Sequence, residues 1–153
     1  MRLLRASSSR DERRSRGQAL VEFAFAAPIF FLLLIGLLEG GRYVFYSESL
    51  NHAAREGARH AIIHGSASRP IAAQTGPGSP DDPGGEAVKQ AVRDAAVGMG
   101  DPGAISIPNP NYSPNNNRRG STVTVSVTYT YTPVVSIFGP ITVDAEATLV
   151  VNN

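Results

Sequence analysis

Residues 17–38 read GQALVEFAFAAPIFFLLLIGLL, and this stretch decides the architecture of the chain. Residues 19–38 carry a single charged side chain, Glu22. Twenty residues of α-helix span about 30 Å, the thickness of the hydrocarbon core of a bilayer. A helix that is apolar on every side is typical of a membrane span rather than of a soluble surface. We therefore predict one transmembrane helix, which tolerates Pro28 with a kink.

The segment before the span is hydrophilic and basic, with two acidic residues, Asp11 and Glu12. Its arginines are Arg2, Arg5, Arg10, Arg13, Arg14 and Arg16. After the span, as far as residue 59, the arginines are Arg42, Arg55 and Arg59. Because the more basic flank of a span stays in the cytoplasm, we expect a cytoplasmic N-terminus. The same position favours a membrane anchor over a nucleic-acid-binding arm, so no nucleic-acid partner is expected.

These features divide the chain into three parts. We expect a basic cytoplasmic leader at residues 1–17, a transmembrane helix at 18–41 and an extracytoplasmic domain at 42–153. A length of 153 residues leaves room for one domain besides the span. The net charge of +1 argues against a polyanion-binding protein, and the absence of cysteine excludes disulfides and thiolate metal sites.

The remainder of the chain predicts an α+β domain. Residues 42–64 have an apolar stripe at steps of three and four, which continues the span outward as a helix. Its members are Tyr43, Tyr46, Leu50, Ala53, Ala54, Gly57, Ala58, Ala61 and Ile62. A second helix is expected at residues 86–99, started by Asp81 and Asp82, with Lys89 on its exposed face.

Two later segments alternate between apolar and polar residues and predict strands. They are residues 123–131 and 141–151, and a short strand is possible at 104–107. A pair of strands would form an antiparallel sheet that is marginal alone, so a helix or a third strand must cover it. The fold class is therefore α+β and pilin-like, with a long N-terminal helix, a second helix and a small antiparallel sheet.

Four polar residues recur at steps of four along the first helix: His52, Glu56, His60 and His64. Two histidines at this spacing can chelate a metal, but a zinc hydrolase needs a third ligand and an open position. No further ligand is apparent, so a polar helix face is favoured over a metal site. We expect no catalytic residue and no cofactor.

Residues 16–62 resemble the TadE-like family of tight-adherence (Flp-type) pilus assembly systems. The matching segments are RGQALVEF at residues 16–23, EGGR at 39–42 and AAREGAR at 53–59, together with Pro28. The resemblance implies a minor pilin or pseudopilin of the inner (cytoplasmic) membrane, cut by a prepilin peptidase. It also implies other pilins and pilus assembly proteins as partners, besides the lipid bilayer.

Applied to this chain, the resemblance implies cleavage between Gly17 and Gln18. Glu22 is then the acidic residue that the mature chain retains. The family has Tyr after this Glu, whereas this chain has Phe23. Glu22 would then guide docking through the α-amine of a neighbouring subunit, because opposite charges attract strongly in a low dielectric. Glu39 and Arg42 are further candidates for assembly contacts, and their i, i+3 spacing allows a pair.

One alternative keeps the chain uncut. It would then be a single-span, membrane-anchored binding module of the cell envelope. The N-terminal residue of the protein in its membrane distinguishes the processed pseudopilin from the uncut binding module.

Overall fold

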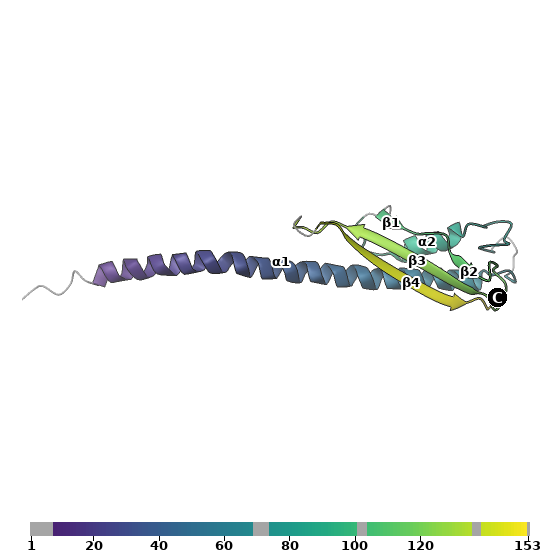
Figure 1. Cartoon of the computed structure of the whole chain (residues 1–153), viewed down its shortest axis with the longest axis horizontal. Helices are drawn as coiled ribbons and strands as arrows, with labels where there is room; N and C mark the ends of the chain where they lie inside the picture. Colours follow the sequence, from purple (N-terminus) through teal and green to yellow (C-terminus); the bar gives the residue numbers. More distant parts are fainter. Residues whose placement is uncertain (1–7, 69–73, 101–103, 136–138, 153) are drawn as a thin grey trace, which may run out of the picture. The chain divides into compact units, whose positions relative to one another are not determined.

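The computed structural model describes residues 8–68, 74–100, 104–135 and 139–152. The elements in chain order are α1 (Ser8–Ile63), α2 (Glu86–Ala95), β1 (Ile105–Ser106), β2 (Asn111–Ser113), β3 (Thr122–Tyr131) and β4 (Ile141–Val150) (Figure 1). A long N-terminal helix, a second helix and a small antiparallel sheet confirm the predicted α+β fold class.

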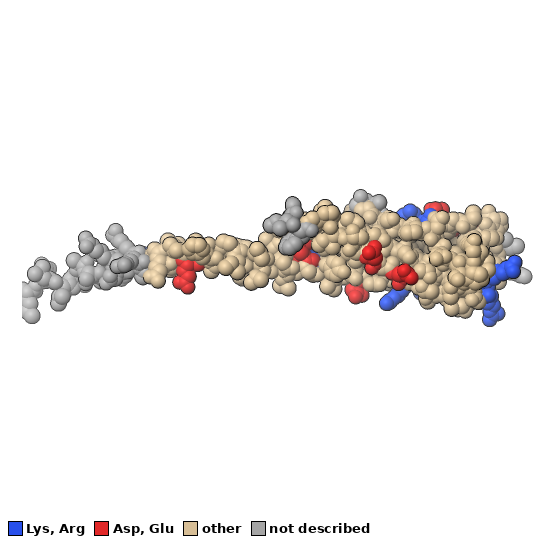
Figure 2. Space-filling model, in the orientation of Figure 1, with Lys and Arg blue, Asp and Glu red and all other residues tan. Residues whose placement is uncertain are grey.

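The first helix, α1, has 56 residues and runs through Pro28. Its described part starts at Ser8, so residues 8–17 of the segment expected to be leader are helical. Among the described residues it is the one helix long and apolar enough to cross a membrane. Figure 2 shows the apolar stretch as a tan surface with one acidic group near its start.

The chain divides into two compact units, Met1–Gly40 and Gly41–Asn153. In the second unit β3 is the central strand. Its whole length pairs antiparallel with β4, with Val125 opposite Ala147. The short strands β1 and β2 pair antiparallel with the other edge of β3, where Ile105 faces Tyr129 and Tyr112 faces Val123.

The core of the second unit lies between one face of this sheet and the helices. The buried residues of β3 are those of its predicted apolar face: Val123, Val125, Val127, Tyr129 and Tyr131. The buried residues that α1 contributes to this core belong to the predicted stripe: Leu50, Ala53, Ala54, Gly57, Ala58 and Ala61. The core also contains Val88 and Val92 of α2 and Val143, Ala145 and Ala147 of β4.

The second helix differs from its prediction at two points. It ends at Ala95 rather than at residue 99, and Gly98 follows with a positive φ of 81°. Lys89 is buried rather than exposed, and its ammonium group forms an ion pair with Glu86. The long methylene stem of lysine packs on apolar surface while the amine reaches a charged partner, which explains the burial.

Candidate processing and assembly site

Gly17 and Gln18, which flank the predicted cleavage site, are exposed residues inside α1. A Cβ atom added to Gly17 would meet no atom within 4 Å. No packing in the described structure therefore requires glycine here. Glycine costs about 1 kcal/mol relative to alanine inside a helix. Gly17 thus makes the predicted scissile bond a weak point of an otherwise continuous helix.

Glu22 is exposed one turn beyond Gln18. Four residues of helix place the two on the same face, about 6 Å apart along the axis. The side chains around Glu22 are large, apolar and exposed: Leu20, Val21, Phe23 and Phe25. No part of the described chain covers the apolar window of this helix. Its surface is therefore available to lipid or to another subunit.

Arg42 lies at the start of the second unit and contacts two tyrosines. Its Nη2 donates a hydrogen bond to Tyr46 Oη at 3.4 Å. The guanidinium carbon lies 5.8 Å from the Tyr46 ring centroid and 5.2 Å from that of Tyr131. The Tyr46 ring also meets Tyr129 and Tyr131, with centroids 5.2 and 4.8 Å apart. A cation over a tyrosine ring contributes about 0.5–1 kcal/mol at exposed sites, so Arg42 stabilises this aromatic cluster.

The sequence does not indicate this cluster as a site, although the alternation of residues 123–131 puts Tyr129 and Tyr131 on the apolar face of their strand. The period-two alternation of β3 could have indicated the cluster, because it places both tyrosines on the same face near the last residue of the strand. Glu39, the other residue expected here, is buried. A Glu39–Arg42 pair stays a prediction.

The histidine stripe is only partly assembled. The rings of His60 and His64 stack with centroids 4.1 Å apart and an interplanar angle of 27°. His64 Nδ1 lies 2.9 Å from the His60 carbonyl oxygen. Glu56 lies 3.9 Å from Arg59 in an exposed ion pair, and His52 is exposed. The stripe is therefore a histidine pair with separate neighbours, rather than a set of convergent ligands.

This histidine pair borders a shallow hollow of about 270 Å³, together with Gln74, Thr75, Asp81, Asp82 and Ala87. Burial lowers the pKa of His60, and the charge of a protonated His64 lowers it further. Asp82 and Glu56 act in the opposite direction. Within the described ranges, no three His, Cys, Asp or Glu side chains are arranged to hold a metal ion.

The fold and the long apolar helix define a class: a candidate single-pass membrane protein with one α+β domain. The comparison with protein families is more specific. Residues 17–59 match the family described as TadE-like protein, as the sequence resemblance predicted. No curated protein and no solved structure matches the chain. A TadE-like segment implies a role in the assembly of a tight-adherence pilus.

Proposed function

We propose that the protein is a minor pilin or pseudopilin of a tight-adherence pilus. In this proposal α1 anchors it in the inner membrane with the N-terminus in the cytoplasm and the α+β unit outside. A prepilin peptidase cuts between Gly17 and Gln18, and the mature chain docks on other pilins and assembly proteins. The protein is not an enzyme.

One observation carries this proposal. The TadE-like match begins at residue 17, the glycine after which cleavage is proposed, and extends through Glu22 to residue 59. It therefore covers the proposed cleavage site, the apolar stretch and the first part of the extracytoplasmic helix. Within residues 18–38, Glu22 is the only charged residue. A carboxylate in a membrane span is costly and seldom present without a role.

The helical position of Gly17 adds a step to the processing reaction. A peptidase must reach the carbonyl carbon of Gly17, whose oxygen accepts a hydrogen bond within an α-helix. Local unwinding of the first turns exposes that peptide bond, and glycine lowers the free energy this requires. The cut then gives Gln18 a new α-amino group.

The new amine and Glu22 together provide the assembly contact. An amine and a carboxylate attract each other strongly where water is scarce. Glu22 of the incoming chain binds the α-amine of a chain already in the complex, and the exposed phenylalanine and leucine side chains around it pack between the two helices. Small extracytoplasmic residues such as Ala53 and Ala58 are buried within the chain's own domain and are not used for this contact.

The experiment that tests the proposal is the intact mass and N-terminal sequence of the protein isolated from membranes of its native host. A chain that begins at Gln18 supports the processed pseudopilin. A chain that begins at Met1 in cells with an active prepilin peptidase contradicts it. That second result would instead favour an uncut, membrane-anchored binding module.

A further inference from the structure

The strand β4 forms an open edge of the sheet in the second unit. Its ten residues all pair with β3 in one continuous register, without a bulge. No other described strand pairs with β4, and Figure 1 shows it at the border of the sheet. Natural proteins protect a long edge strand with proline, lysine or a bulge, because its free backbone groups can pair with another chain. Residues 141–150 contain neither proline nor lysine, so this edge is open to a further strand.

The hydrogen bonds at the end of β4 show which of its backbone groups point outward. Val151, the next residue, donates its N–H to the Ser121 carbonyl, and its own carbonyl accepts the N–H of Gly120. Val151 therefore directs its backbone groups toward the β3 side of the ladder. Because this direction alternates along an antiparallel strand, the even-numbered residues of β4 direct theirs away from β3. The residues whose backbone groups face the open edge are Thr142, Asp144, Glu146, Thr148 and Val150.

The solvent-facing side of this edge is acidic. Asp144 and Glu146 are exposed, and among the described residues neither forms an ion pair. Figure 2 shows acidic groups on the face where β4 lies. Residues 144–146 and 126–128 line a shallow hollow of about 320 Å³. A basic side chain on a neighbouring strand can reach these carboxylates, since directly opposed Cβ atoms lie about 5 Å apart. The edge therefore favours a positively charged partner.

A second copy of β4, paired antiparallel, does not fit this edge. The outward backbone groups can bond only when even-numbered residues lie opposite one another. The registers of greatest overlap then put Asp144 opposite Glu146 of the second copy, or Glu146 opposite its own counterpart. Like charges directly opposed destabilise a sheet. The other long strand, β3, already has β4 on one edge and the short strands β1 and β2 on the other. The partner strand therefore comes from a different protein.

The core-side face of β4 adds an apolar requirement. Val143, Ala145 and Ala147 are buried on this face, whereas Leu149 is 37% exposed. Successive side chains of a strand point to opposite faces of the sheet. A partner that presents basic residues to the solvent side therefore presents the residues between them to the core side. Apolar residues at those positions would cover Leu149.

We propose that the open edge of β4 binds an extended segment of another protein that alternates basic and apolar residues. The segment adds a strand to the sheet: its backbone hydrogen bonds supply affinity, and its alternating side chains supply specificity. Its basic residues face Asp144 and Glu146, and its apolar residues cover Leu149. All of these residues follow residue 59, the last of the TadE-like match. The contact is therefore separate from the cleavage after Gly17 and from the apolar stretch of α1.

Two synthetic peptides test the proposal against the full chain in a zwitterionic detergent. Each has about ten residues, to match the length of β4. One peptide alternates lysine with valine, and its twin alternates glutamate with valine. Fluorescence anisotropy of the labelled peptides measures binding. We expect the lysine peptide to bind about tenfold more tightly than the glutamate peptide, because two cross-strand pairs change from attraction to repulsion.

A proline variant separates strand addition from simple charge attraction. Thr148→Pro removes an outward N–H and leaves the hydrogen bonds to β3, since an edge strand tolerates proline where its N–H faces solvent. It should abolish binding of the lysine peptide. Thr148→Val keeps the N–H and should keep the binding. Circular dichroism shows that both variants are folded.

A charge-reversal variant tests the role of the two carboxylates. The double variant Asp144→Lys with Glu146→Lys should prefer the glutamate peptide. The matched control is Asp81→Lys with Asp94→Lys, which makes the same change in net charge at exposed positions outside the sheet. This control should retain the wild-type preference for the lysine peptide.

Each of the other outcomes overturns the proposal. If neither peptide binds at about 1 mM, the edge does not accept a strand. If Thr148→Pro binds the lysine peptide as the wild type does, the attraction is electrostatic and no strand is added. If the charge-reversal variant keeps the wild-type preference, Asp144 and Glu146 do not select the partner. If the wild-type chain self-associates in sedimentation and Thr148→Pro does not, a second copy occupies the edge instead.

Discussion

Gly57 of α1 lies directly against the side chain of Val92 of α2, so closely that a Cβ atom at residue 57 would clash with it. The same Cβ would lie 3.3 Å from Val125 Cγ1 of β3. Three elements of the second unit therefore meet at one glycine. The small residues on this part of α1 thus serve the packing of the chain's own domain.

We expect Gly57→Ala to destabilise the domain. Overpacking a filled core costs about 1–3 kcal/mol. The better helix propensity of alanine offsets about 1 kcal/mol of this. Chemical denaturation of the full chain in detergent, followed by circular dichroism, measures the difference. The matched control is Gly41→Ala, where a Cβ meets nothing within 4 Å. If the Gly57→Ala chain is as stable as the Gly41→Ala chain, α1 and α2 can move apart to admit the added methyl group without a measurable loss of stability.

The main features of this domain were predictable because they follow from local periodicity. The stripe on α1 and the alternation of β3 and β4 contain the residues that these elements bury in the domain core, although Tyr43 and Leu149 of the predicted apolar faces are exposed. The strand β2 was not predicted, because it depends on pairing with a segment distant in the sequence. The strand β2 has three residues in an Asn- and Pro-rich segment, and only its register with Thr122–Thr124 makes it a strand.

The site was predictable to a smaller extent. The spacing of His60 and His64 predicted their proximity, whereas Asp82 approaches them only through the fold of the described residues 74–85. Thr75, in this segment, is held by contacts with residues distant in sequence. Asn117 Nδ2 donates a hydrogen bond to the Thr75 carbonyl, and Thr75 N donates one to the His64 carbonyl. No sequence pattern around Thr75 or Asn117 indicates that these two residues are hydrogen-bonded.

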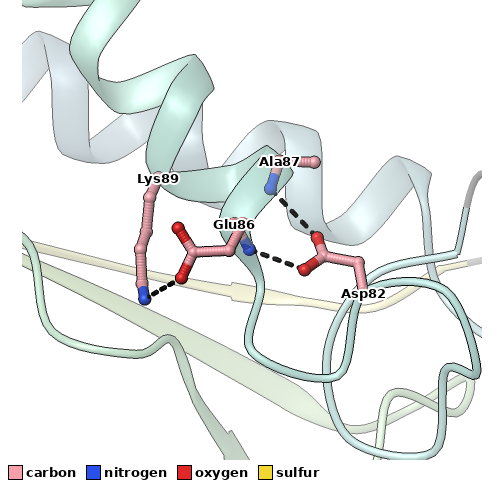
Figure 3. Close-up of polar contacts among 4 residues, drawn as sticks. All are labelled: Asp82, Glu86, Ala87 and Lys89. Carbon is pink, nitrogen blue, oxygen red and sulfur yellow. Dashed lines mark hydrogen bonds and ion pairs between the residues drawn. The ribbon is translucent and has the colours of Figure 1, made fainter.

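Asp82 supports the first turn of α2, and its substitution should weaken that helix. Its carboxylate oxygens accept hydrogen bonds from the backbone N–H groups of Glu86 and Ala87, at 2.7 and 3.0 Å (Figure 3). Loss of a side chain that satisfies free helix N–H groups costs about 1 kcal/mol. We expect Asp82→Ala to lower the free energy of unfolding by this amount. The exposed neighbour Asp81 provides the control Asp81→Ala, which should unfold like the wild type.

The stability of the domain should fall as the pH is lowered. The pKa of His60 is below its usual 6.5 in the folded chain because of burial and the neighbouring His64. The unfolded chain therefore binds a proton first, and stability is lost as the pH falls from 6.5 through the lower folded value. Asp82, Asp81, Glu56 and His64 are the charged groups near this ring.

The test compares unfolding at about pH 7.5 and about pH 5.5, on either side of the ordinary histidine pKa. His60→Gln should reduce the loss of stability between the two values, and the exposed His52→Gln should leave it unchanged. Equal pH dependence in the wild type and in His60→Gln would assign the effect to the carboxylates instead.

Gly17→Ala should slow the proposed cleavage without affecting membrane insertion. Alanine strengthens the helix across the scissile bond by about 1 kcal/mol. It also places a methyl group where the peptidase must approach. The intact mass of the membrane-bound chain separates cut from uncut protein. Gly36→Ala is the matched control, because Gly36 also lies in α1 with nothing within 4 Å of an added Cβ. Complete processing of Gly17→Ala would remove Gly17 from the proposed recognition site.

Glu22→Gln should separate processing from assembly. Glutamine keeps the size and polarity of the side chain but removes the charge that the proposed amine contact requires. A hydrogen bond to a charged group contributes about 1.5–3 kcal/mol. Its loss should therefore lower incorporation into the pilus complex by about tenfold to a hundredfold. Crosslinking in native membranes measures the incorporation, while the intact mass shows whether the chain is still cut. Glu48→Gln, at an exposed position of the same helix outside the apolar stretch, should change neither quantity. If Glu22→Gln assembles as well as Glu48→Gln, the carboxylate does not guide docking, and the apolar surface of α1 must direct assembly alone.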